Sequence, residues 1–105
     1  MSGGKRDHPR DPSDLSPEAR RLYDEIVQDY DLSPAERQAL IGGLVALDQA
    51  IACERVVAKE GPVVVDRFGQ AQRHPAAVMG RDLRREFVQT LTTLGLATKY
   101  AEGDR

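Results

Sequence analysis

The chain has 105 residues, of which 40% are hydrophobic and 30% charged, and its formal net charge is −2. This length can bury one small core but leaves little material for a deep catalytic pocket, so we expect a single domain or a protomer completed by its neighbours. The near-neutral charge excludes a histone-like coat of positive charge, and any nucleic-acid surface must therefore be a local patch. The single cysteine, Cys53, cannot form an intramolecular disulfide, which fits a reducing cytosol.

The first fourteen residues are polar and contain glycine, proline and charges of both signs, without an apolar cluster. They are predicted to form a flexible charged arm over residues 1–14, and they lack the apolar segment of a signal peptide. No apolar run in the chain approaches the roughly 20 residues that a membrane span needs. We therefore expect an intracellular protein that does not interact with membranes.

A first helix is expected over about residues 17–30. Ser16 is a typical N-cap residue, and Pro17 fits the first helical position because its missing amide hydrogen would have no helical partner there. The apolar residues that follow recur at steps of three and four and make one stripe: Ala19, Leu22, Tyr23, Ile26, Val27 and Tyr30.

A second, long helix is expected to run to about Lys59. Ser33 and Glu36 have the spacing of a capping box at its start, and Gly61 with Pro62 ends it. Two apolar rows follow its length, which is more than one short partner can cover, so we expect neighbouring helices on one side and another subunit on the other. The rows are Leu40, Leu44, Leu47, Ile51 and Ala58, and beside them Ile41, Val45, Ala52 and Val56.

Within this helix, Gly42 and Gly43 each cost helix stability on the order of 1 kcal/mol. Their expected use is a close approach of two helices or a local bend. The residues predicted to lie at the subunit interface are Leu40, Leu44, Leu47, Ile51 and, from the segment after the helix, Phe68.

The segment from Pro62 to Pro75 is predicted to be a short β-hairpin or an extended loop. Its valine run favours a strand, and the residues around Gly69 favour a turn. Two strands alone are marginal in water, so the hairpin is expected to lean on the helices, with Phe68 as its anchor. A last helix should run from Pro75 to a C-cap at Gly95, with an apolar stripe of Ala76, Met79, Leu83, Phe87, Leu91 and Leu94. Residues 15–97 thus form a three-helix core, mainly α, and residues 98–105 a polar tail.

The sequence predicts no enzyme, cofactor or metal site. Cys53 could in principle form a Cys-His pair with His8 or His74, but His8 lies in the arm and Cys53 is expected in mid-helix beside apolar positions. A buried small hydrophobic side chain is the favoured interpretation of Cys53. No set of three or four ligands has metal-binding spacing, and no glycine-rich loop follows a strand.

Basic residues are unevenly distributed along the chain. The stretch from Arg67 to Arg85 holds five arginines and one acid, Asp82. Arginine binds phosphate through a planar fork, so contact with a nucleic-acid backbone is one interpretation. A solvated face with i,i+4 pairs is the other, and spacing alone favours it slightly. The candidate DNA-binding residues are Arg67, Arg73, Arg81, Arg84 and Arg85, with a second group of Arg20, Arg21, Lys5, Arg6 and Arg10.

The order of these segments resembles a known family. After the charged arm come Leu15–Tyr23, Ile26-Val27 and Tyr30–Leu32, then a long helix with Leu47-Asp48, then Glu60–Val64, Asp66–Gln70 and His74–Ala76, and a helix with Arg81-Asp82 and Phe87 that ends at Leu94–Leu96. The most specific stretch is Asp66-Arg67-Phe68-Gly69 followed by His74-Pro75. Over residues 14–97 the chain looks like the small terminase subunit of tailed bacteriophages.

This resemblance implies a DNA-packaging protein without enzymatic activity of its own. Such proteins form rings, here expected to have about eight to ten subunits. They recognise double-stranded viral DNA at the packaging site in the host bacterial cytoplasm, and they recruit and regulate the terminase large subunit, an ATPase and nuclease. Compared with longer relatives, the chain is expected to have a short C-terminal segment. No separate helix-turn-helix domain is expected in the arm, so DNA should be contacted by the core helices or by the arm itself.

A second hypothesis is a small helical transcriptional regulator or an antitoxin-like interaction protein, which would normally be a dimer. The number of subunits discriminates between the two hypotheses.

Overall fold

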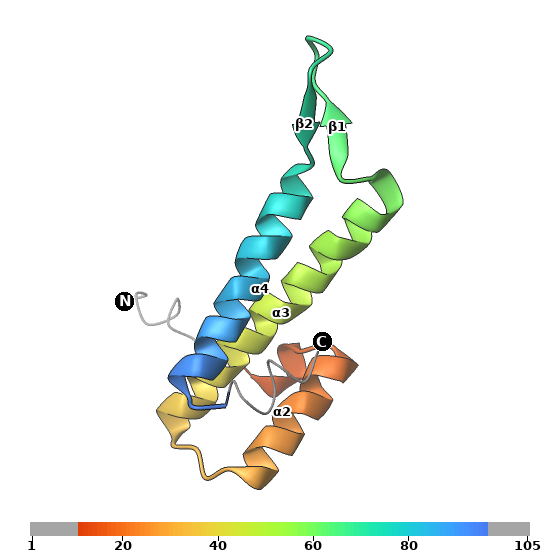
Figure 1. Cartoon of the computed structure of the whole chain (residues 1–105). Coiled ribbons are helices and arrows are strands. Elements are labelled where there is room, and N and C mark those ends of the chain that lie inside the picture. Colours follow the sequence, from red (N-terminus) through yellow and green to blue (C-terminus); the bar gives the residue numbers. More distant parts are fainter. Residues whose placement is uncertain (1–10, 97–105) are drawn as a thin grey trace, which may run out of the picture.

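A computed structural model describes residues 11–96, and helices dominate this part of the chain (Figure 1). The predicted mainly helical fold is confirmed, with three helices and a two-stranded antiparallel hairpin between the second and the third. The elements in order are η1 (Pro12–Asp14), α2 (Pro17–Asp29), α3 (Pro34–Glu60), β1 (Val63–Val65), β2 (Ala71–Arg73) and α4 (Pro75–Thr93).

The predicted helix starts are confirmed at α2 and α3. The Ser16 hydroxyl accepts a hydrogen bond from the Ala19 amide at 3.1 Å. At α3 the capping box is complete, because the Ser33 hydroxyl accepts from the Glu36 amide at 3.1 Å and the Glu36 carboxylate accepts from the Ser33 amide at 2.8 Å. These local contacts explain why α2 and α3 begin where the sequence indicates.

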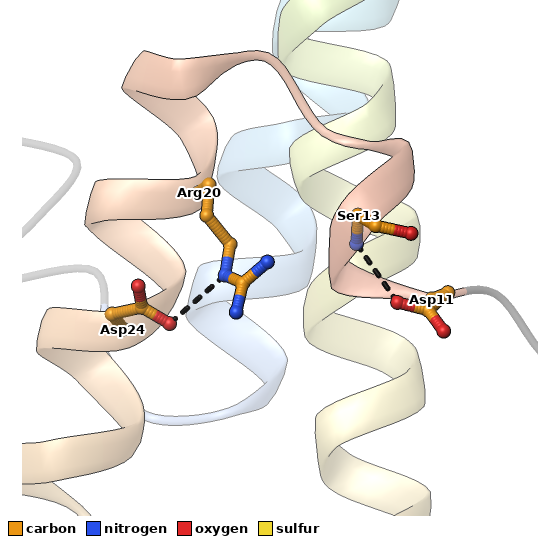
Figure 2. A network of polar contacts seen from close by, with 4 residues as sticks. All are labelled: Asp11, Ser13, Arg20 and Asp24. Carbon is orange, nitrogen blue, oxygen red and sulfur yellow. Dashed lines mark hydrogen bonds and ion pairs between the residues drawn. The ribbon is translucent and has the colours of Figure 1, made fainter.

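The last residues of the predicted flexible arm have a regular structure. Residues 12–14, which were assigned to the flexible arm, form the short 3-10 turn η1. Asp11 caps this turn by accepting from the Ser13 amide at 2.9 Å (Figure 2). Residues 1–10 of the predicted arm and the whole predicted tail, residues 98–105, lie outside the described residues.

The hydrophobic core lies where α2 packs against the N-terminal half of α3 and the C-terminal half of α4. Leu40 and Leu44 have no exposed area there, so the prediction that they form a subunit interface is wrong for this protomer: they fill its own interior. The core residues are Leu15, Ala19, Tyr23, Ile26, Leu32, Leu40, Ile41, Leu44, Phe87, Leu91 and Leu96.

Helices α3 and α4 approach each other closely at Gly43. A Cβ atom at this position would lie 2.8 Å from Cγ2 of Thr90, which is closer than real Cβ contacts allow. Of the two expected uses of the paired glycines, a close helix–helix approach is thus the one that Gly43 serves.

Beyond the core, α3 and α4 continue as a pair that no other helix among residues 11–96 covers, and the hairpin extends from the end of this pair (Figure 1). No residue of α3 after Ala50 is buried. The radius of gyration is 16.4 Å, compared with about 12–13 Å for a compact chain of this length. The protomer is therefore elongated, and much side-chain surface of α3, α4 and the hairpin stays exposed within the described part of the chain.

The hairpin does not lean on the helices, and Phe68 is not its anchor. The strands pair in the register Val63↔Arg73 to Val65↔Ala71, while Phe68 lies in the connecting turn with 75% of its surface exposed. The turn is instead held by the Asp66 carboxylate, which accepts from the amides of Phe68 at 2.8 Å and Gln70 at 2.9 Å.

The base of the hairpin is fixed by His74, a residue that the sequence analysis did not identify as a helix cap. Its amide donates to the carbonyl of Pro62 at 2.8 Å, and its Nδ1 accepts from the Ala76 amide at 3.0 Å. Since Nδ1 accepts, Nε2 carries the hydrogen and donates to the Glu60 carboxylate at 2.7 Å. The side chain of one buried histidine therefore joins the end of α3 to the start of α4.

Acid is expected to loosen the turn only well below neutral pH. The backbone hydrogen bond from Gln70, aided by the bonds from Phe68 and the Gln72 side chain, holds the pKa of Asp66 below its ordinary value of 3.8. A lowered pKa means that Asp66 stabilises the folded turn above pH 3.8 and that this contribution is lost as the pH falls through the folded value. In an NMR titration, the amide shifts of Phe68 and Gln70 should therefore change with a midpoint below 3.8. The Asp66→Asn variant should lack this transition, and a midpoint above 3.8 would contradict the turn geometry.

Candidate functional site

The predicted DNA-binding arginines occupy three elements that are spread along the protomer. The first pair lies on α2, the second on the hairpin and the remaining three on α4 (Figure 1). The structure therefore does not gather them into one cluster within the protomer. They are Arg20 and Arg21 on α2, Arg67 and Arg73 on the hairpin, and Arg81, Arg84 and Arg85 on α4, whereas Lys5, Arg6 and Arg10 lie outside the described residues.

Two of these arginines are engaged by acids of the same protomer. On α2, Arg20 donates from Nε to the Asp24 carboxylate at 3.1 Å, an i,i+4 pair on the exposed side of the helix (Figure 2). On α4, Arg84 binds Glu54 of α3 through two hydrogen bonds of 2.8 and 3.0 Å. The hydrogen bond from Arg84 is the main reason that the pKa of Glu54 lies below its ordinary value. Arg84 thus holds α4 to α3.

Two arginines of α4 keep most of their side-chain surface in solvent. Arg81 and Arg85 flank Asp82, with nitrogen–oxygen distances of 3.6 and 3.9 Å, and more than half of each side chain is exposed. Long, exposed contacts of this kind contribute little, about 0–1 kcal/mol. Arg81 and Arg85 can therefore exchange Asp82 for another anion at small cost.

The arginines of the hairpin have no acidic partner among residues 11–96. The guanidinium carbon of Arg67 lies 5.2 Å from the centre of the Phe68 ring, which is a cation–π distance. Arg73 ends β2 opposite Val63 and is exposed. Both guanidinium groups are available to an anionic partner outside the protomer.

Basic residues of α3 were missed by the sequence analysis. Arg55 lines a shallow groove of about 240 Å³ together with Ser16 and Asp48, and Lys59 follows one turn later on the same side of the helix. Arg55 and Lys59 are four positions apart and lie outside the two apolar rows. The sequence alone could therefore have indicated an exposed basic pair on this helix.

The same region contains a polar link between the start of α2 and α3. The Asp48 carboxylate accepts from the Ser16 amide at 2.9 Å and from the Ser16 hydroxyl at 2.7 Å. Asp48 is therefore a structural residue that fixes the start of α2 beside the middle of α3.

Exposed apolar side chains gather on the hairpin and on the adjoining half of α4. Val65 is 68% exposed and Met79 57%, so the prediction that Met79 belongs to the core stripe of α4 is wrong. Of the other predicted interface residues, Leu47 and Ile51 are half-buried beside α2, and Phe68 is exposed. Isolated surface hydrophobic residues are normal, but a contiguous set of them is typical of an interaction surface.

A shallow groove runs along this half of α4, with a volume of about 530 Å³. Its apolar residues are Pro75, Val78, Met79 and Leu83, and its acidic residues are Asp82 and Glu86.

No group of three or more histidine, cysteine or carboxylate side chains within residues 11–96 is arranged to hold a metal ion. Cys53 is half-buried and lies against Gly80 at the α3–α4 contact. In the described part of the chain, none of the helices combines the length and the apolar composition needed to cross a membrane.

Comparison with known proteins places the chain in a family. The family model described as phage terminase, small subunit, matches residues 18–100, which is most of the chain. Searches of curated proteins and of solved structures found no match. The matched span covers the hairpin and the three helices, except for the first residue of α2, and the resemblance seen in the sequence is thereby confirmed: the chain belongs to the phage terminase small subunit family.

Proposed function

We propose that this protein recognises double-stranded viral DNA at the packaging site and recruits and regulates the terminase large subunit, without catalytic activity of its own. It acts as a ring of identical subunits in the cytoplasm of the bacterial host. The observation that carries this proposal is the family match over residues 18–100. An elongated protomer with unpartnered apolar surface and exposed arginines supports it.

DNA contact is assigned first to Arg81 and Arg85. Both are exposed, both lie on the same side of α4 at i,i+4 spacing, and their contacts with Asp82 are long. Arg21 on α2 is also exposed and forms no ion pair within the described residues. Arg84 is excluded from this set because its guanidinium is bound to Glu54. In a ring, each subunit repeats these arginines, so a weak local patch becomes a continuous basic track for the phosphate backbone.

The salt dependence of DNA binding tests this assignment. Arg81→Ala and Arg85→Ala should each weaken binding and flatten the plot of log Kobs against log salt by about 0.9 for every phosphate contact that is lost. The measurement is fluorescence anisotropy with labelled double-stranded DNA between about 50 and 200 mM salt.

The matched control is Arg37→Ala, which removes an exposed arginine from the first turn of α3, on a different element from the proposed contacts. This variant should keep the wild-type slope. If Arg81→Ala and Arg85→Ala also kept it, α4 would not be the DNA-contacting element.

A further inference from the structure

The tip of the hairpin presents an aromatic ring and an arginine to solvent. Phe68 is 75% exposed, and the guanidinium carbon of Arg67 lies 5.2 Å from the centre of its ring. The Oδ1 atom of Asp66 accepts from the amides of Phe68 and Gln70, at 2.8 and 2.9 Å. Its Oδ2 atom accepts from Nε2 of Gln72 at 2.8 Å. Both carboxylate oxygens are thus engaged within the turn, and the charge that the tip offers to a partner is positive.

The strands behind the tip add an apolar face and a second arginine. Residues opposite each other in an antiparallel pair share a face, so Val63 and Val65 lie on the same face as Ala71 and Arg73. All four are exposed. Neither Arg73 nor Arg67 forms an ion pair within residues 11–96. The hairpin is therefore suited to a partner that offers both apolar and anionic groups.

The minor groove of duplex DNA has this composition. Phosphates line its edges, and deoxyribose rings, which are largely apolar, form its walls. Two-stranded β-ribbons enter DNA grooves in several classes of DNA-binding protein. Proteins that bind the minor groove also insert an apolar side chain, often Phe, between neighbouring base pairs and thereby bend the duplex. The hairpin has the shape, the charge and the exposed ring that this mode of binding requires.

The hairpin has a fixed direction beyond the helices. His74 is the single residue between β2 and α4, and it is buried and bound to Glu60 and Pro62. The hairpin continues the direction of the α3–α4 pair (Figure 1). From Arg81 to the start of α4 is about 9 Å along the helix, and β2 adds about 10 Å. The separation of about 20 Å is less than one turn of B-DNA, about 34 Å, so the hairpin and α4 are within reach of one bound duplex.

We propose that the hairpin enters the minor groove of the DNA and that Phe68 inserts between two neighbouring base pairs and bends the duplex. Arg67 and Arg73 bind phosphates at the edges of the groove, and the exposed valines contact its walls. This proposal rests on the DNA recognition that is part of the proposed function, and it adds the element that deforms the DNA. Since some base steps open more easily than others, the hairpin selects DNA by its deformability.

DNA bending tests the proposal in the full chain. The probe is a duplex of about three helical turns with a fluorescent donor and acceptor at its ends, in about 50 mM salt, where phosphate contacts support binding without a specific site. The wild type should bend it by about 20–90° and raise the energy transfer. Phe68→Ala should lose the bend and weaken binding about tenfold, because the stacking of the ring on a base is lost. Phe68→Leu keeps an apolar side chain that can insert, so it should retain the bend.

The matched control is Val56→Ala, which shortens a 38% exposed apolar side chain on α3, outside the hairpin. It should leave the bend and the affinity unchanged. Phe68 and Val56 are both exposed, so all three variants should keep the wild-type circular dichroism spectrum.

A second probe carries one mismatched base pair at its centre, which lowers the cost of opening a base step. The wild type should bind it about tenfold more tightly than the matched duplex, whereas Phe68→Ala should bind both duplexes equally.

Three results would overturn the proposal while the DNA recognition of the proposed function stands. The wild type could bind the duplex without bending it, Phe68→Ala could bend and bind it as the wild type does, or the wild type could show no preference for the mismatched probe. If Phe68→Ala changed the mass of the assembly but not DNA binding, the hairpin would contact a protein, and the proposal would again be wrong. If the wild type bound neither probe, the DNA recognition itself would fail, and the insertion of Phe68 with it.

Discussion

Replacing Phe87 with alanine is expected to lower the free energy of unfolding by about 3–5 kcal/mol. The side chain is only 1% exposed and belongs to the cluster that joins α2, α3 and α4. Its removal takes away apolar contact with all sides of the core and leaves a cavity that the helices cannot fill without moving. Since single domains are stable by about 5–15 kcal/mol, this one change should bring the protein close to unfolding at physiological temperature.

The measurement is urea unfolding followed by circular dichroism, at one protein concentration because assembly makes stability depend on concentration. The neighbouring residue provides the control: Val88 is 38% exposed, and Val88→Ala should cost less than about 1 kcal/mol. If Phe87→Ala and Val88→Ala lowered the free energy of unfolding equally, α4 would have to be rotated so that Phe87 no longer faces the core.

Local signals in the sequence predicted the helices well. The capping box of Ser33 and Glu36 and the prolines at the first helical positions act over three or four residues, so they depend on no distant contact. The cap by His74 was missed because histidine is not among the favoured N-cap residues, and its role here depends on Glu60, fourteen residues earlier.

The partner of each apolar face could not be predicted from periodicity. Leu40 and Met79 both fall on regular apolar stripes, but Leu40 is buried in the core cluster with residues of α2 and α4, whereas Met79 is 57% exposed. A repeat of three and four residues identifies a face without saying what packs on it. The same limit explains Phe68, whose anchoring role was taken over by the hydrogen bonds of Asp66.

The spacing of charged residues in the sequence predicts ion pairs within a helix, but not ion pairs between helices. The Arg20–Asp24 pair follows the i,i+4 rule and is of the kind that the solvated-face interpretation describes. The Arg84–Glu54 pair joins residues thirty positions apart, which only the packing of α4 on α3 brings together. Distinguishing a free arginine from an engaged one therefore required the fold.

The largest change expected on assembly concerns the mass of the wild-type protein. The exposed hairpin and the α4 groove would leave Val65, Phe68 and Met79 in solvent in a monomer. Self-assembly of the kind proposed above would cover exposed apolar surface, and the number of subunits distinguishes a ring from a dimer.

Native mass spectrometry of the wild-type protein tests the ring most directly. We expect one dominant species of about eight to ten protomers, or about 90–120 kDa for a protomer of 11.6 kDa. A mass of one protomer would contradict self-assembly, and a mass of two would contradict the ring and favour the dimeric regulator or antitoxin-like protein instead.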